Sequence, residues 1–74
     1  MSKLPQVRPK DLVRAFEKAG FNQIRQTGSH VFLKHPDGRL TSVSIHSKPI
    51  PTGTLRAILK QTKIKTEDLK ELLK

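Results

Sequence analysis

Apolar residues recur in steps of three and four near the start of the chain, a spacing typical of a helix with one buried face. Pro9 suits the first helical position, and Gly20 favours a stop at the end of the pattern. Residues 1–8 show no such period. We therefore expect a flexible tail over residues 1–8 and a single domain over residues 9–74. The periodic apolar residues are Leu12, Ala15, Phe16 and Ala19.

An alternation of apolar and polar residues follows and predicts antiparallel strands. Residues 21–27 give a weak strand signal, whose apolar anchors are Phe21 and Ile24, and Gly28 then predicts a turn. Stronger strand signals cover residues 29–35 and 40–46. The loop between these two strands is Pro36-Asp37-Gly38, in which proline suits a type I turn and glycine a left-handed backbone.

The length of this loop decides which side chains share a face of the hairpin. With three loop residues, Val31 pairs with Val43, whereas a two-residue turn would divide the apolar residues between both faces. In the favoured register His30 and His46 are diagonal neighbours, roughly 7–8 Å apart at the backbone. The apolar face carries Val31, Leu33, Val43 and Ile45. The opposite face carries His30, Phe32, Lys34, Ser42, Ser44 and His46.

Two helices are predicted in the last third of the chain. Thr52 and Thr66 are suitable N-caps for them. The predicted order is helix, three antiparallel strands, helix, helix. This order indicates an α+β fold with the helices on one face of the sheet and the other face open. The apolar stripes are Leu55, Ile58 and Leu59 in the first of these helices and Leu69, Leu72 and Leu73 in the second.

The charge balance predicts a polyanionic partner. Fifteen Lys and Arg residues against six acidic residues give a formal net charge of +9, which favours binding that weakens in salt. No acid lies between Asp37 and Glu67. The alternative interpretation is a solvated surface without a partner. The cations in this interval are Arg39, Lys48, Arg56, Lys60, Lys63 and Lys65.

Composition also argues against several classes of protein. The chain has no cysteine, and its histidines and carboxylates lack metal-ligand spacing, so we expect no disulfide, metal site or cofactor. No segment is apolar enough to span a bilayer or to act as a signal peptide, which predicts a cytoplasmic protein without membrane contact. Only three aromatic residues are present, all Phe, which argues against a binder built on stacked bases.

Four motifs carry a resemblance to a known family. Ala19-Gly20-Phe21 ends the first helix, Gly28-Ser29-His30 precedes the second strand, His46 closes the third strand, and residues 53–61 read Gly-Thr-Leu-Arg-Ala-Ile-Leu-Lys-Gln. With these motifs, the chain from about residue 9 to residue 69 resembles the HicA family of small toxins. These toxins are the mRNA-cleaving halves of HicA–HicB toxin–antitoxin pairs.

The resemblance implies a double-stranded-RNA-binding-domain-like α-β-β-β-α fold, here with an extra short C-terminal helix. It also implies a ribonuclease that works without metal and uses the histidine of Gly-Ser-His, here His30. A HicB-like antitoxin is expected to bind the toxin and cover that site. The antitoxin usually carries a DNA-binding module, so this chain would meet DNA only through it.

The sequence departs from the family pattern at two places. Thr62-Lys63 stand where an Ala-Gly pair commonly ends the helix, which costs about 1 kcal/mol if the C-cap is left-handed. Ile45 stands where a proline often precedes the second histidine. We expect these departures to affect local geometry more than activity.

Histidine suits acid–base chemistry on RNA, because its unperturbed pKa lies near neutrality. RNA supplies its own nucleophile, the 2′-hydroxyl. We expect His30 to act as a base or an acid, although a histidine that only bonds the backbone is the alternative. His46 is the candidate for a second acid or base, or else anchors the following turn. Gly28 is expected to form the turn before His30. Ser29 is expected to orient the His30 ring or to bond a phosphate oxygen, or else only to shape the turn.

The remaining candidates are cations that neutralise phosphate. Lys34 and Lys48 are predicted near the face of His30, and Arg56 and Lys60 on the following helix are predicted to hold an RNA backbone or to dock an acidic antitoxin. His35 beside the hairpin loop is expected to be structural or exposed. The leading hypothesis is thus a metal-independent endoribonuclease. The alternatives are a non-catalytic RNA-binding module and, more weakly, a DNA-binding accessory protein without a recognisable helix-turn-helix.

Overall fold

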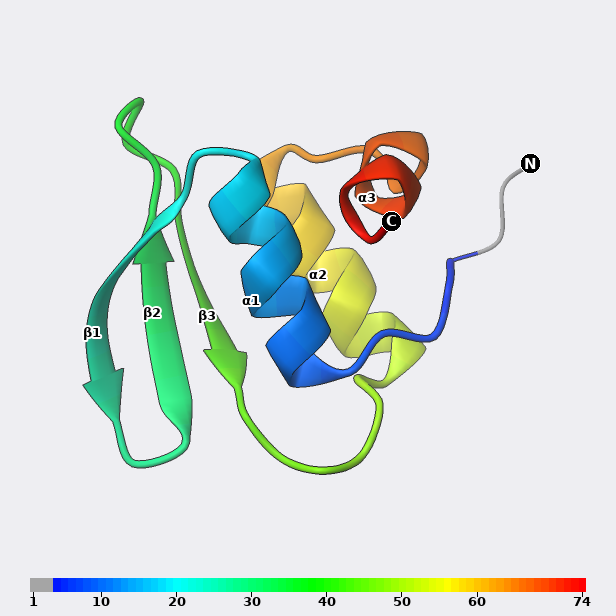
Figure 1. The fold of residues 1–74 in the computed structure, drawn as a ribbon, viewed down its shortest axis with the longest axis horizontal. Coiled ribbons are helices and arrows are strands. Elements are labelled where there is room, and N and C mark those ends of the chain that lie inside the picture. Colours follow the sequence, from blue (N-terminus) through cyan, green and yellow to red (C-terminus); the bar gives the residue numbers. More distant parts are fainter. Residues whose placement is uncertain (1–3) are drawn as a thin grey trace.

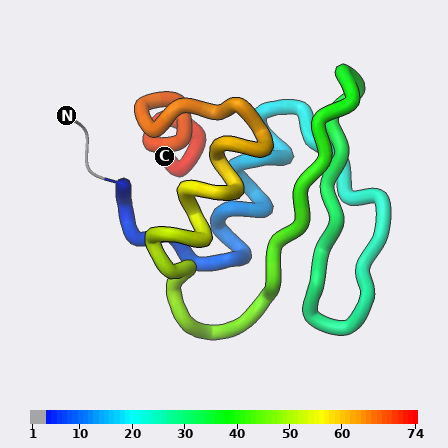
Figure 2. The backbone as a smooth tube through the Cα atoms, turned by 180° about the vertical axis from the view of Figure 1, so that it is seen from behind, coloured from blue at the N-terminus to red at the C-terminus, as the bar shows by residue number. Residues whose placement is uncertain are grey.

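The computed structural model, which describes residues 4–74, has the predicted α+β architecture. A sheet with strand order β1-β2-β3 is antiparallel throughout. Figures 1 and 2 show α1 and α2 side by side against this sheet, with α3 on the far side of the helix pair. One face of the sheet is therefore left open. The elements are α1 (Pro9–Lys18), β1 (Asn22–Thr27), β2 (His30–Lys34), β3 (Leu40–Ser44), α2 (Thr52–Thr62) and α3 (Thr66–Leu72).

The core lies between the sheet and the helices. Phe16 of α1, Leu33 of β2 and Leu69 of α3 are fully buried. Part of the segment predicted as a tail also packs here, because Val7 is 2% exposed and its carbonyl accepts a hydrogen bond from the Ile50 N–H at 2.8 Å. The prediction of a flexible tail is therefore wrong at Val7. Residues 1–3 of that segment lie outside the described residues.

The β2–β3 hairpin has the predicted register, with Val31 opposite Val43. The Gly38 N–H donates to the His35 carbonyl at 2.9 Å, and Gly38 has a φ of 102°, as a type I turn with a bulge requires. The prediction that β3 extends to His46 is wrong. Pairing ends with the Ile45 N–H donating to the Ser29 carbonyl at 2.6 Å, because Ser29 already belongs to the β1–β2 turn and β2 offers no further partner.

Strand β1 differs from the expectation that Ile24 anchors it in the core. Ile24 is 56% exposed, and the pairing with β2 shifts between Gln23 and Arg25. This shift is a β-bulge at Ile24, which moves every later residue of β1 to the opposite face. Arg25 consequently stands beside Phe32.

Arg39 joins the hairpin loop to the helical layer. Its Nε lies 2.8 Å from an oxygen of the Asp37 carboxylate, and its guanidinium carbon lies 5.1 Å from the centre of the Phe21 ring. A guanidinium nitrogen, Nη1, also donates to the carbonyl of Thr62 at the end of α2. Arg39 is therefore a structural clamp, although it is one of the cations from which a polyanion-binding surface is predicted.

The helix ends differ by one residue from the predicted caps. Thr52 and Thr66 are the first helical residues, and Pro51 and Lys65 occupy the cap positions without a side-chain hydrogen bond. At the other end of α2, Lys63 is the C-cap with a left-handed backbone, φ 58° and ψ 27°. Lys63 thus has a strained backbone at the position where the family pattern commonly has the glycine of an Ala-Gly pair.

Replacing Lys63 by glycine should raise the free energy of unfolding by about 1 kcal/mol. Glycine removes the left-handed Cβ penalty, although it also gives the unfolded chain more freedom. In a domain of this size the change corresponds to a rise in Tm of about 4–8 °C. Thermal unfolding of Lys63→Gly beside Lys63→Ala measures it. An equal gain from alanine would instead assign the effect to charge, because alanine removes the charge and keeps the Cβ.

Asp37 holds the hairpin loop through its carboxylate. That carboxylate accepts hydrogen bonds from the Arg39 backbone N–H at 3.1 Å and from Arg39 Nε at 2.8 Å. The backbone bond, together with the guanidinium and the nearby His35 ring, lowers the pKa of Asp37 below its ordinary value of 3.8. The ionised carboxylate is thus favoured in the folded state.

Acidification should loosen this loop. Because the pKa of Asp37 is lower folded than unfolded, its contribution to stability is present above about pH 3.8 and is lost as pH falls through the folded value. An NMR titration of the Asp37 carboxyl carbon, in folded and in urea-unfolded protein, measures both pKa values. The Asp37 pKa should rise in Arg39→Ala, and equal pKa values in the folded and unfolded proteins would contradict this account.

Candidate nucleic-acid interface

His30 stands at the start of β2 because a tight turn precedes it. Thr27 pairs with His30, so Gly28 and Ser29 form a two-residue turn, and Gly28 alone of the two has a positive φ, 56°. Glycine with a positive φ at the first turn position is the type II′ hairpin geometry. The alternation that buries Val31 then leaves His30 exposed on the other face. The turn of Gly28 and Ser29 thus comes directly before His30 at the start of β2.

The side of the sheet away from the helices, called the open face from here on, is arranged in rows across the three strands. His30 lies between Thr27 and Ser44, and Phe32 lies between Arg25 and Ser42. None of the residues on this face is acidic. Its residues are Asn22, Ile24, Arg25, Thr27, His30, Phe32, Lys34, Leu40, Ser42 and Ser44.

The cations on this face lie at different distances from His30. Lys34 is exposed and is four residues along β2, roughly 13 Å from His30 at the rise of a strand. Lys34 thus lies at the opposite end of β2 from His30. Arg25 is one row from His30 on the adjacent strand. Sequence reasoning missed Arg25, because only the bulge at Ile24 turns it to this face.

His46 lies two residues beyond the end of β3. It lines a cavity of about 500 Å³ with Arg8 and with three residues of α1, Lys10, Asp11 and Arg14. His30 is not among the residues lining that cavity. The predicted pairing of the two histidines rested on a strand reaching residue 46, and the strand stops short of it. Whether His46 takes part in chemistry stays a prediction.

The other polar candidates fall on separate surfaces. Lys48 is exposed in the loop from β3 to α2, which Figure 1 shows at the same end of the molecule as the β1–β2 turn. His35 packs its ring edge against Phe21, with ring centres 5.1 Å apart, and its Nδ1 accepts the Asp37 N–H at 3.2 Å. His35 is therefore structural, as one of the two predicted alternatives had it.

Arg56 and Lys60 line a groove of about 600 Å³ on the helical side of the molecule. Lys63 and Lys65 add further positive charge, and Glu67 adds one acid. The apolar side chains in the groove are Leu4, Leu59 and Ile64. The groove spans the connection from α2 to α3, which lies at the opposite end of the molecule from the β1–β2 turn (Figure 1). These cations therefore do not share a surface with His30.

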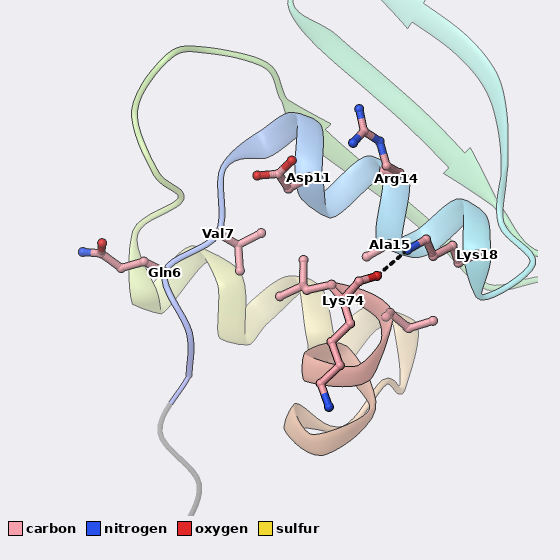
Figure 3. Close-up of a pocket in the computed structure, with 9 residues that line it drawn as sticks. Gln6, Val7, Asp11, Arg14, Ala15, Lys18 and Lys74 are labelled. Carbon is pink, nitrogen blue, oxygen red and sulfur yellow. Dashed lines mark hydrogen bonds between the residues drawn. The ribbon is translucent and has the colours of Figure 1, made fainter.

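A further cavity of about 380 Å³ separates the N-terminal segment, α1 and the C-terminal helix. Figure 3 shows that the charged ends of Arg14 and Lys74 point away from it, and that Lys18 Nζ donates to the Lys74 carbonyl at 2.8 Å. Apolar side chains, including Val7 and Ala15, line its interior. The hydrogen bond from Lys18 to Lys74 holds the end of the chain against α1.

Among the described residues, 4–74, no group of three or more His, Cys, Asp or Glu side chains is placed to hold a metal ion. Within the same range, every helix is too short or too polar to cross a membrane.

The fold and the open face define a small basic α+β domain that presents a histidine and cations, without acids, on an uncovered sheet. A family model described as the HicA toxin of bacterial toxin–antitoxin systems matches residues 9–64, most of the chain. The chain belongs to this family, and is thus a toxin that pairs with an antitoxin. A comparison with curated proteins gave no match.

Proposed function

We propose that this toxin is a metal-independent endoribonuclease that cleaves mRNA with His30 and is inhibited by a HicB-like antitoxin. The observation that carries the proposal is the position of His30, exposed on the acid-free open face of a chain in the HicA toxin family. Its substrate, mRNA, would place its action in the cytoplasm.

The proposed reaction uses groups that RNA and this face supply. The 2′-hydroxyl oxygen attacks the adjacent phosphorus, the bond from phosphorus to the 5′-oxygen breaks, and a 2′,3′-cyclic phosphate and a 5′-hydroxyl remain. One proton leaves the 2′-hydroxyl and one is added to the 5′-oxygen. His30 serves one of these transfers, and water or a second side chain serves the other. Gly28 and Ser29 fix the position of the ring through the turn.

Positive charge near the phosphate is the second requirement. Arg25 and Lys34 lie on the open face with His30, and Lys48 lies in a loop at the same end of the molecule as the β1–β2 turn. We assign Arg25 to the phosphate nearest His30 and Lys34 to a neighbouring phosphate. His46 remains the candidate for the second proton transfer, from its place beyond β3.

Arg56 and Lys60 are proposed contacts of either RNA or the antitoxin. The partly buried apolar residues of the groove, Leu4 and Ile64, favour a protein there, because nucleic-acid backbone gains little from apolar surface. An acidic antitoxin segment would complement the surrounding cations. This contact would leave the inhibition of His30 to another part of the antitoxin.

The competing function is a non-catalytic RNA-binding module of the same fold. Cleavage of a long unstructured RNA by purified protein in EDTA separates the two functions. The proposal requires that the wild type cuts and that His30→Ala does not. Equal RNA binding by both proteins without cutting would establish the binding module. Equal cutting by both would assign catalysis to another residue or to a contaminant.

A further inference from the structure

Phe32 is the one aromatic residue outside the core among the described residues. Phe16 and Phe21 are almost completely buried. Phe32 is only partly buried, and it lies on the open face, away from the residues packed around the core. Its side chain points to the same side as that of His30, two residues earlier on β2, about 7 Å away along the strand.

The neighbours of Phe32 leave room for a planar ligand. Ser42, opposite it on β3, is small and exposed, and Arg25, opposite it on β1, supplies a positive charge. Nucleobases stack on aromatic side chains regardless of sequence, provided that the base is unpaired. An aromatic ring beside a cation is therefore a platform for one base and an adjoining phosphate.

We propose that Phe32 stacks with an unpaired nucleobase next to the bond that His30 cleaves, and that the substrate is therefore single-stranded RNA. This inference rests on the function proposed for His30. It revises the expectation, drawn from the low aromatic content, that base stacking plays no part. Arg25 binds the phosphate between the two sites.

Another protein is the competing occupant of the open face, because Ile24 and Leu40 are 56% and 52% exposed there. Charge favours RNA, since the face carries Arg25, Lys34 and no acid. The alignment of His30 and Phe32 on one strand also matches a linear polymer, in which a base and the next phosphate follow each other. A folded protein surface would gain nothing particular from that alignment.

The test measures RNA binding to the full chain in a His30→Ala background, which prevents cleavage during the titration. The probes are a fluorescein-labelled unstructured ten-nucleotide RNA, alone and annealed to its complement, followed by fluorescence anisotropy. Adding Phe32→Leu should weaken binding of the single strand by about tenfold. Binding of the duplex should not change. Phe32→Tyr should restore the affinity, because it restores the ring.

A second readout follows the stack directly. The chain contains no tryptophan, so Phe32→Trp introduces a single fluorophore. Its emission should be quenched by the single-stranded RNA and not by the duplex. Leu40→Ala, on the same face, is the matched control and should leave RNA affinity unchanged. Thermal unfolding of every variant confirms that each is folded during the titration.

Any of three results overturns the inference. The first is an equal affinity of Phe32→Leu and its parent for the single strand, and the second is an equal loss of affinity for the single strand and the duplex. The third is that the single strand does not quench the tryptophan emission of Phe32→Trp. Weaker binding of an antitoxin to Phe32→Leu, with RNA binding unchanged, would assign the face to a protein. Failure of the proposed function looks different. In that case the wild-type chain does not cleave RNA, although the emission of Phe32→Trp is quenched by it.

Discussion

Replacing His30 by alanine is expected to lower the rate of RNA cleavage by about 10²–10⁴-fold, the usual contribution of a general acid or base. The side chain is exposed on the open face and makes no part of the core, so the free energy of unfolding should change by no more than about 0.5 kcal/mol. Loss of activity without loss of stability is the expected signature. Single-turnover cleavage of a labelled RNA and thermal unfolding measure the two quantities.

Of the other two histidines, His35 is the matched control for this experiment, and His46 is a second test of the proposed chemistry. His35→Ala removes the edge contact with Phe21 and should lower stability by about 1 kcal/mol, while the folded protein cleaves at the wild-type rate. His46→Ala tests the second proton transfer, because a loss comparable to that of His30→Ala would place both residues in the reaction. If His30→Ala retains full activity in a preparation free of contaminating nuclease, His30 is not catalytic.

The face that carries His30 could be predicted from the sequence because two simple rules agree there. Residues in strands alternate between faces, and a three-residue loop puts Val31 opposite Val43. Any other register would have exposed half of the apolar side chains of the hairpin. Hydrophobic burial thus determines where His30, Phe32 and Lys34 lie, even though none of them belongs to the core.

The position of Arg25 could not be predicted, because nothing in β1 fixes its register. Every residue from Asn22 to Thr27 is exposed, so a shift by one residue costs little hydrophobic burial. The sequence of β1 is therefore equally compatible with a regular strand and with a strand that has a bulge at Ile24. The predicted third strand fails to reach His46 for a different reason. The alternation of apolar and polar residues does continue to residue 46, but β2 begins at His30, which pairs with Ser44, and has no residue left to pair with His46.

The sequence also does not reveal that one of the cations, Arg39, has a structural role. Arg39 was one of several cations in a long interval without acids, and its linear position resembles theirs. Its partners, Phe21, Asp37 and Thr62, come from three separate parts of the chain. Only the fold brings them together. The cation count therefore overestimates the surface available to a polyanionic partner.

Removing this clamp should be the most damaging change outside the core. Arg39→Ala loses the Asp37 ion pair, the contact with Phe21 and the hydrogen bond to the Thr62 carbonyl, which together are worth about 2–3 kcal/mol. A domain of this length has a total stability of about 4–11 kcal/mol. Tm should therefore fall by at least about 10 °C, measured by circular dichroism.

Two further variants separate geometry from charge. Arg39→Lys keeps the charge but lacks the planar fork that reaches the carboxylate and the carbonyl at once, so it should lose most of the same stability. Lys34→Ala removes an exposed cation from the same hairpin and should change stability by no more than about 0.5 kcal/mol. If Arg39→Lys is as stable as the wild type, a diffuse charge effect explains Arg39 better than the clamp does. The geometry predicts that Arg39→Lys is less stable than the wild type, because one rigid guanidinium holds α2 and the hairpin loop together and a flexible ammonium cannot replace it.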